Sequence, residues 1–116
     1  MPIFEQGDVV RVPFPYSDGV ARQYRPALVV SRGAIGEGRR LLWVVMITSA
    51  ANRAWADDVD FGASYSSAGL PAPSRIRPAK VATIDAVRAE PLGRTDTDIV
   101  SRVLDSVRAY LAPAVD

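Results

Sequence analysis

The sequence contains no cysteine and no histidine among its 116 residues. The absence of cysteine excludes disulfides, thiolate zinc sites and a cysteine nucleophile. The absence of histidine removes the usual general base and the commonest transition-metal ligand. Any catalysis must therefore use Arg, Thr, Ser, Asp, Glu or Tyr side chains. We expect neither a metal nor another cofactor.

Long hydrophobic runs are also absent. The longest, residues 41–47, is far shorter than the ~20 residues that a membrane span needs, and the first residues do not form a signal peptide. Hydrophobic residues make up 48% of the chain and charged residues 23%, as in ordinary soluble proteins. We expect one domain over residues 1–116, located in the cytoplasm, with no membrane contact.

Lysine is scarce, because Lys80 is the only lysine among 14 basic residues. Residues 1–80 hold ten basic and seven acidic residues, whereas residues 81–116 hold four and six. The planar guanidinium of arginine binds phosphate oxygens and stacks on bases, which favours a nucleic-acid partner. An arginine-rich composition set by the base composition of the genome explains the same excess, and composition leaves both explanations open.

Short apolar segments at irregular spacing predict a mainly β (α+β) fold, a small barrel with a helix at its end. The predicted strands are residues 8–14, 27–32, 41–48, 59–61, 74–77 and 81–84, with a weaker one at 86–90. Gly33, Gly36 and Gly38 predict a turn between the second and third strands, with Arg39 and Arg40 as exposed charge beside it. Residues 63–72, rich in Ser, Gly, Ala and Pro, predict a long loop of the kind that often meets ligands.

From Thr95 onward the apolar period becomes helical. Thr95 and Asp98 have the spacing of a capping box, and Pro113 ends the pattern. One stripe carries the apolar side chains, and it predicts a helix that packs on the barrel. Its members are Ile99, Val100, Val103, Leu104, Val107, Tyr110 and Leu111.

Arg25 precedes Pro26 and the apolar run 27–30. Proline favours an extended backbone at the residue before it and cannot donate to a sheet, so Arg25 is predicted at the start of a strand as a positioned cation. Gly7 and Asp8 open the preceding strand. With this Gly-Asp pair, the Arg-Pro pair and later segments at 69–74, 77–80, 83–85 and 92–94, the chain resembles the PemK/MazF family of toxin endoribonucleases from about residue 7 to residue 111.

The resemblance implies an SH3-like β-barrel of the CcdB/PemK type with a C-terminal helix. It also implies a homodimer, a cognate antitoxin protein and single-stranded RNA as partners, with sequence-specific cleavage that needs no metal. Arg25 matches the family's strand-start arginine and Thr48 its catalytic threonine. In the implied reaction the ribose 2′-hydroxyl attacks phosphorus, and both side chains stabilise the negative charge of the transition state.

The general base is open, because Val20 and Ala79 stand where many relatives carry an acidic residue. Asp18, in the same loop as Val20, is our candidate for the missing base, although Ser17-Asp18-Gly19 equally fits a turn. Losing such a base typically slows a reaction by ~10²–10⁴-fold.

Five further residues are candidates for RNA binding. Arg77 matches an arginine that some relatives use for catalysis or phosphate binding, although a surface ion pair is an equal alternative. Tyr24 and Trp55 could stack on bases. Trp43, in contrast, is predicted in the core. Ser49 and Arg22 complete the set beside the proposed catalytic residues.

The cluster of Asp57, Asp58 and Asp60 lacks the other oxygen ligands of a calcium loop, so we expect a solvated acidic edge. Two alternative functions remain. One is a toxin of the same fold that binds a protein target such as DNA gyrase, as the related CcdB toxins do. The other is a degenerate member that binds RNA without cutting it.

Overall fold

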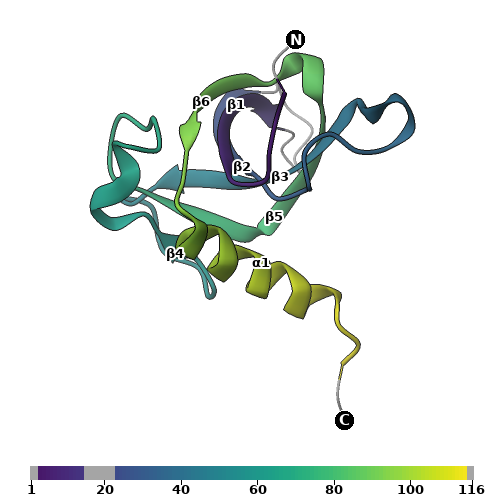
Figure 1. Cartoon of the computed structure of the whole chain (residues 1–116). Coiled ribbons are helices and arrows are strands. Elements are labelled where there is room, and N and C mark those ends of the chain that lie inside the picture. The colour runs from purple at the N-terminus through teal and green to yellow at the C-terminus, as the bar shows by residue number, and fades with distance from the viewer. Residues whose placement is uncertain (1–2, 15–22, 115–116) are drawn as a thin grey trace.

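A computed structural model describes residues 3–14 and 23–114 of the chain. Its six strands form one antiparallel sheet in the order β4-β5-β3-β2-β1-β6 (Figure 1). The strands are β1 (Asp8–Phe14), β2 (Gln23–Val29), β3 (Leu41–Ser49), β4 (Val59–Asp60), β5 (Ser74–Asp85) and β6 (Glu90–Arg94). Helix α1 (Thr97–Leu111) follows β6, and short 3-10 turns occur at Glu37–Arg39, Gly62–Tyr65 and Ala86–Arg88.

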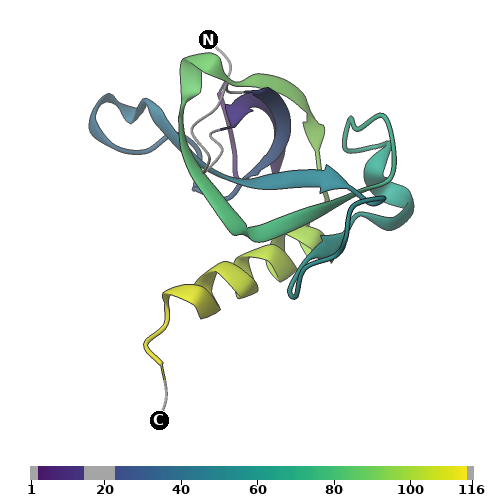
Figure 2. The ribbon, with the colours of Figure 1, turned by 180° about the vertical axis from the view of Figure 1, so that it is seen from behind.

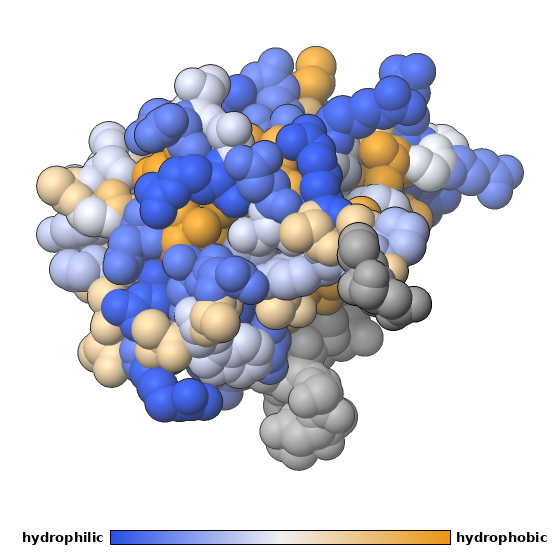
Figure 3. Space-filling model, turned by 90° about the horizontal axis from the view of Figure 1, so that it is seen from below, coloured by the Kyte–Doolittle hydropathy of each residue, from blue (hydrophilic) through white to orange (hydrophobic). Residues whose placement is uncertain are grey.

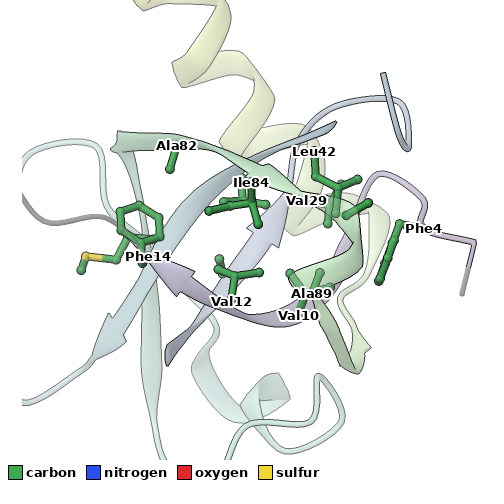
Figure 4. Close-up of a cluster of buried hydrophobic side chains, with 13 residues drawn as sticks. Phe4, Val10, Val12, Phe14, Val29, Leu42, Ala82, Ile84 and Ala89 are labelled. Carbon is green, nitrogen blue, oxygen red and sulfur yellow. The ribbon is translucent and has the colours of Figure 1, made fainter. Parts of the chain in front are cut away.

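The sheet curls on itself, and Figures 1 and 2 show the long, bent strand β5 running beside β3, with β6 returning on the other side of the curl to pair with β1. This small curled barrel with a C-terminal helix confirms the predicted fold class. The inner cluster runs from Phe4 at one end to Phe14 at the other (Figure 4). Helix α1 lies outside the barrel, so its buried Ile99 and Val103 belong to a second cluster on the outer face.

Strand alternation explains the two clusters. Neighbouring residues of a strand point to opposite faces of the sheet, so a strand buried on both sides reads as an unbroken apolar run. In β3, Val44 and Met46 pack inside the barrel, whereas Val45 and Ile47 pack outside it. The same parity in β2 places Ala27 and Val29 inside and Leu28 outside.

Strand β5 corrects the prediction of two separate strands, because it runs without a break from Ser74 to Asp85. The register passes from Val81 opposite Val45 directly to Arg77 opposite Met46. Three residues of β5, Pro78 to Lys80, are therefore skipped in the pairing with β3. This irregularity admits a proline, which has no N–H to donate to the ladder, and bends the strand.

Other boundaries also differ from the prediction. Strand β2 begins at Gln23, before Pro26, because it pairs with β1 over residues that precede its pairing with β3. The weak strand predicted at 86–90 is wrong: Ala86–Arg88 is a 3-10 turn and β6 starts at Glu90.

Helix α1 confirms the predicted helix but not its cap. Asp96, not Thr95, is the N-cap residue, and its carboxylate accepts a hydrogen bond of 2.9 Å from the backbone N–H of Ile99. The side chain of Thr95 is buried instead. A carboxylate at this position satisfies an N–H that the helix leaves open and also suits the helix dipole.

The predicted glycine turn and the predicted loop of residues 63–72 are both present. Gly33, Gly36 and Gly38 all have positive φ in the turn between β2 and β3. The 63–72 loop is packed onto the barrel, since Ala68 and Leu70 are buried in the outer cluster.

Figure 3 looks onto the α1 side of the molecule, where hydrophilic side chains predominate around a few hydrophobic ones. Within the described residues, no helix has the length and apolar character that a membrane crossing requires.

Candidate functional site

Arg25 and Thr48 lie at the same end of two neighbouring strands. The last β2–β3 pair is Ala27 opposite Met46, and each site residue lies two positions beyond it, which keeps both on the inner face by strand alternation. Arg25 is also the register partner of Val12, an inner-face residue of β1. The fold therefore brings a guanidinium and a hydroxyl to the Phe14 end of the barrel.

The two side chains differ in burial. Arg25 is partly buried, and its Nη2 lies 3.4 Å from Oε1 of Gln23. Thr48 is only 6% exposed, and its Oγ1 accepts a hydrogen bond of 2.7 Å from Nδ2 of Asn52. A partly exposed cation and a hydroxyl at the same end of neighbouring strands are groups that can bind an anion such as a phosphate.

The loop of residues 50–58 folds back over this end of the sheet and is held by arginines from β5. Arg75 Nη1 donates to the carbonyl of Asn52 at 3.0 Å. Arg77 Nη2 donates to the carbonyl of Arg53 at 2.9 Å and to Oδ2 of Asp58 at 3.0 Å. These contacts fix the loop that carries Asn52.

Arg77 is not in a surface ion pair, and that alternative is wrong. The side chains of Arg77 and Asp58 are only 9% and 5% exposed, so their ion pair is buried. The guanidinium of Arg77 also stacks on Trp55, 4.2 Å from the ring centroid. Removing two charges from water is costly unless each is paired and hydrogen bonded, and here the pair, the carbonyl of Arg53 and the ring together satisfy the guanidinium.

The expected solvated acidic edge is wrong for Asp58 for the same reason. Asp57 and Asp60 are exposed, and each interacts with a different side chain. Asp57 accepts a hydrogen bond of 3.0 Å from the hydroxyl of Tyr110, and Asp60 lies 3.6 Å from Nε of Arg75. The three carboxylates therefore pair with two elements of the fold, Asp57 with α1 and both Asp58 and Asp60 with β5.

The predicted stacking residues lie in different places. Trp55 is 37% exposed and contacts Arg77, with the ammonium of Lys80 5.4 Å from its ring centroid. Tyr24 points to the opposite face from Arg25, because the two are neighbours in β2, and its ring lies under Arg11 at 4.6 Å. The structure thus keeps Trp55 beside the candidate site and places Tyr24 on the other face of the sheet.

Ser49 ends β3 on the face opposite Thr48, and its Oγ accepts a hydrogen bond of 3.1 Å from the N–H of Ala51 in the following turn. Asp18 and Arg22, like Val20, lie outside the described residues, so their predicted roles stay predictions. Ala79 lines an apolar groove of about 540 Å³ on the outer face.

Trp43 corrects the prediction that it belongs to the core, since it is 50% exposed. Its neighbours Leu42 and Val44 point into the barrel, so Trp43 points outward, where α1 covers only part of the sheet. It lines the same groove as Ala79, together with Val81 and Tyr110.

Sequence reasoning missed three residues of this region: Asn52, Asp58 as an ion-pair partner, and Arg75. Asn52 is a common turn residue after a strand, and its position four residues after Thr48 was the available signal. Asp58 lies 19 residues from Arg77, and no local pattern connects the two.

The fold defines the class of small, curled antiparallel β-barrel proteins, here with an arginine and a threonine at one end of neighbouring strands. The sequence profile of the PemK-like, MazF-like toxins of type II toxin-antitoxin systems matches residues 5–111. The chain belongs to this family and is a type II toxin of the MazF/PemK kind. No curated protein matches the sequence as a relative.

Solved structures share the fold. MazF (Form-I) from Deinococcus radiodurans has a TM-score of 0.77 at 23% identity, over 96% of this chain and 98% of that one. A MazE-MazF structure (Form-II) from Deinococcus radiodurans has a TM-score of 0.73 at 22% identity, over 98% and 100%. An endoribonuclease in complex with its cognate antitoxin from a mycobacterial species has a TM-score of 0.72 at 18% identity, over 97% and 99%.

Proposed function

We propose that this toxin is a sequence-specific, metal-independent endoribonuclease that cuts single-stranded RNA in the cytoplasm. The observation that carries the proposal is the placement of Arg25 and Thr48 on one face, at one end of neighbouring strands. Endoribonuclease activity is typical of the family, and one structure of the same fold is described as an endoribonuclease with its cognate antitoxin.

In the proposed reaction the ribose 2′-oxygen forms a bond to the adjacent phosphorus as its proton passes to a base. The bond from phosphorus to the 5′-oxygen breaks, and that oxygen takes up a proton. The products are a 2′,3′-cyclic phosphate and a 5′-hydroxyl. No water or metal enters the chemical step, which is compatible with a chain that has neither histidine nor cysteine.

Arg25 and Thr48 supply the electrostatic part of this mechanism. Charge accumulates on the nonbridging phosphate oxygens as the fifth bond forms, so donors placed there bind the transition state more tightly than the substrate. Arg25 contributes a full positive charge, and the hydroxyl of Thr48 contributes a directed hydrogen bond. Asp18 remains our candidate for the base.

The remaining predicted contacts take supporting roles. Trp55 offers a partly exposed ring for base stacking, and Arg22, which lies outside the described residues, stays a candidate for RNA binding. Ser49 and Tyr24 could contact RNA only from the face opposite Thr48 and Arg25. Arg77 acts on RNA through the loop that it holds, because its guanidinium is occupied by Asp58 and the carbonyl of Arg53. We also propose that the toxin works as a homodimer and is silenced by an antitoxin, as the MazE-MazF neighbours suggest.

Cleavage of a long unstructured RNA in the presence of EDTA tests the proposal. The parent protein should cut the RNA at defined sequences and leave cyclic phosphate ends. Arg25→Ala should remove most of the activity. Arg88→Ala is the matched control, because Arg88 is exposed in the 3-10 turn that follows β5, at the opposite end of the barrel.

Other outcomes distinguish the alternative functions. RNA that is bound tightly but stays intact would indicate a degenerate RNA-binding member. Cells that express the toxin and suffer DNA damage while their messages remain uncut would indicate a gyrase-type protein target. Either outcome would contradict the proposed nuclease function.

A further inference from the structure

We infer that Asn52 is a positioning residue, which sets the direction of the Thr48 hydroxyl for the phosphate. The inference rests on the proposed function, because it gives Thr48 a task only where a phosphate is bound. It goes beyond the sequence reasoning, in which Asn52 had no role.

The hydrogen bond between the two side chains determines where the Thr48 proton goes. Nδ2 of Asn52 donates to Oγ1 of Thr48 at 2.7 Å, and an amide nitrogen can only donate. A hydroxyl has one proton and two lone pairs, so a hydroxyl that accepts from Asn52 keeps its proton for another acceptor. Thr48 is 6% exposed, and a phosphate oxygen bound at the Phe14 end of the barrel would be an acceptor of the right charge.

Without Asn52 the hydroxyl would be free to rotate. Threonine side chains readily donate to nearby backbone carbonyls, and such a contact would withdraw the proton from the substrate. A hydrogen bond prepared before substrate arrives needs no reorganisation during the reaction, which is the physical advantage of a preorganised donor.

The backbone around Asn52 is fixed on both sides, as a positioning residue requires. Its N–H donates to the carbonyl of Ser49 at 3.1 Å, which closes the turn after β3. Its carbonyl accepts from Arg75 Nη1 at 3.0 Å, and Arg75 is the register partner of Thr48 on β5. The next carbonyl, that of Arg53, accepts from the buried Arg77.

These contacts connect Arg75 and Arg77 to the chemistry without a direct contact to RNA. Both arginines hold the backbone of the turn, and the turn presents the amide of Asn52 to Thr48. The buried ion pair between Arg77 and Asp58 closes the far end of the same loop.

The test combines RNA cleavage kinetics with variants of Asn52 that differ in hydrogen-bonding direction. Asn52→Ala should lower kcat by about tenfold, as the loss of one hydrogen bond predicts, and leave KM nearly unchanged. Asn52→Asp has the same shape but only acceptors at neutral pH, so it would capture the Thr48 proton. It should therefore lose more activity than Asn52→Ala.

The pH dependence separates this role from a structural one. A protonated carboxylic acid can donate as an amide does, so Asn52→Asp should recover activity relative to Asn52→Ala as the pH falls toward about 4. Ala51→Ser is the matched control, since it changes an exposed side chain in the same turn, and it should cut RNA like the parent.

A double-mutant cycle provides a second measurement under single-turnover conditions. In a Thr48→Val background, Asn52→Ala should cost less than about twofold, because the hydroxyl that it orients is gone. Two results would overturn the inference without affecting the proposed nuclease function. One is an equal loss of cleavage rate for Asn52→Ala in both backgrounds, and the other is an Asn52→Asp variant that is more active than Asn52→Ala at neutral pH. A parent protein that cuts no RNA would instead overturn the proposed function, and the inference with it.

Discussion

Oδ2 of Asp58 lies 3.0 Å from Nη2 of Arg77, in an ion pair that joins the 50–58 loop to β5 beneath the ring of Trp55. Both side chains are almost fully buried, and Arg77 is the register partner of Met46, which packs on the inner face of the sheet. The position of the 50–58 loop therefore depends on the ion pair between Asp58 and Arg77.

Replacing Asp58 with Ala should destabilise the protein strongly. The substitution leaves the guanidinium of Arg77 buried without a counter-charge, and breaking such a pair typically costs about 3–5 kcal/mol. Chemical denaturation of the variant should show this loss in the free energy of unfolding.

Asp60→Ala is the matched control, because its carboxylate is 65% exposed and lies 3.6 Å from Arg75. An exposed pair of this kind contributes about 0–1 kcal/mol. Equal costs for the two substitutions would mean that the Asp58 pair is solvated, contrary to the structure.

Gly69 and Gly93 form a close backbone contact between the 63–72 loop and β6. A Cβ at Gly69 would overlap the carbonyl oxygen of Leu92, and φ at Gly69 is +85°. Gly69→Ala should therefore destabilise the protein by at least about 2 kcal/mol, the sum of a left-handed backbone and a steric clash.

Gly62→Ala separates the two contributions. Gly62 also has a positive φ, of 57°, but a Cβ there would meet nothing within 4 Å. It should cost only the backbone contribution of about 1–2 kcal/mol, measured in the same denaturation experiment. A Gly69 variant no less stable than the Gly62 variant would show that the loop does not pack against β6.

Tyr110 should titrate above the usual tyrosine range. Burial first, then the hydrogen bond to Asp57 and the negative charges of Asp57 and Asp58, raises the pKa of Tyr110 above 10.0. Folding thus favours the neutral phenol. Its contribution to stability is complete below the unfolded pKa and is lost as the pH rises through the higher folded pKa.

The difference in tyrosinate absorbance between the parent and Tyr110→Phe isolates this residue. Asp57→Asn should move the pKa of Tyr110 back toward 10.0, because it removes the nearer negative charge. A Tyr110 that titrates at or below the ordinary value in the parent would be inconsistent with the contact to Asp57.

The barrel and its helix were predictable because short apolar runs and a helical stripe are local signals. The continuous run at 41–47 predicted β3 correctly, but it could not place Trp43. A run buried on both faces has no visible alternation, so only the pairing of Leu42 and Val44 with the inner cluster shows that Trp43 points outward.

Some residues of the candidate site were also predictable from the sequence, and others were not. Arg25 was predicted from the Arg-Pro pair and Thr48 from the family resemblance, and the register of β2 and β3 places both at one end of the sheet. The buried pair of Asp58 and Arg77 was not predictable, because it depends on how a loop folds over a strand that is distant in sequence. Asn52 was missed for a related reason, since its role appears only in its contact with Thr48.

The most direct measurement is single-turnover cleavage of a long unstructured RNA in EDTA by the parent, Arg25→Ala and Arg88→Ala proteins. The parent and Arg88→Ala should cut at the same sequences with similar rate constants, while Arg25→Ala should lose most of the activity and stay folded. An Arg25→Ala protein that cuts as fast as the parent, or a parent that leaves the RNA intact at high enzyme excess, would contradict the proposed nuclease site.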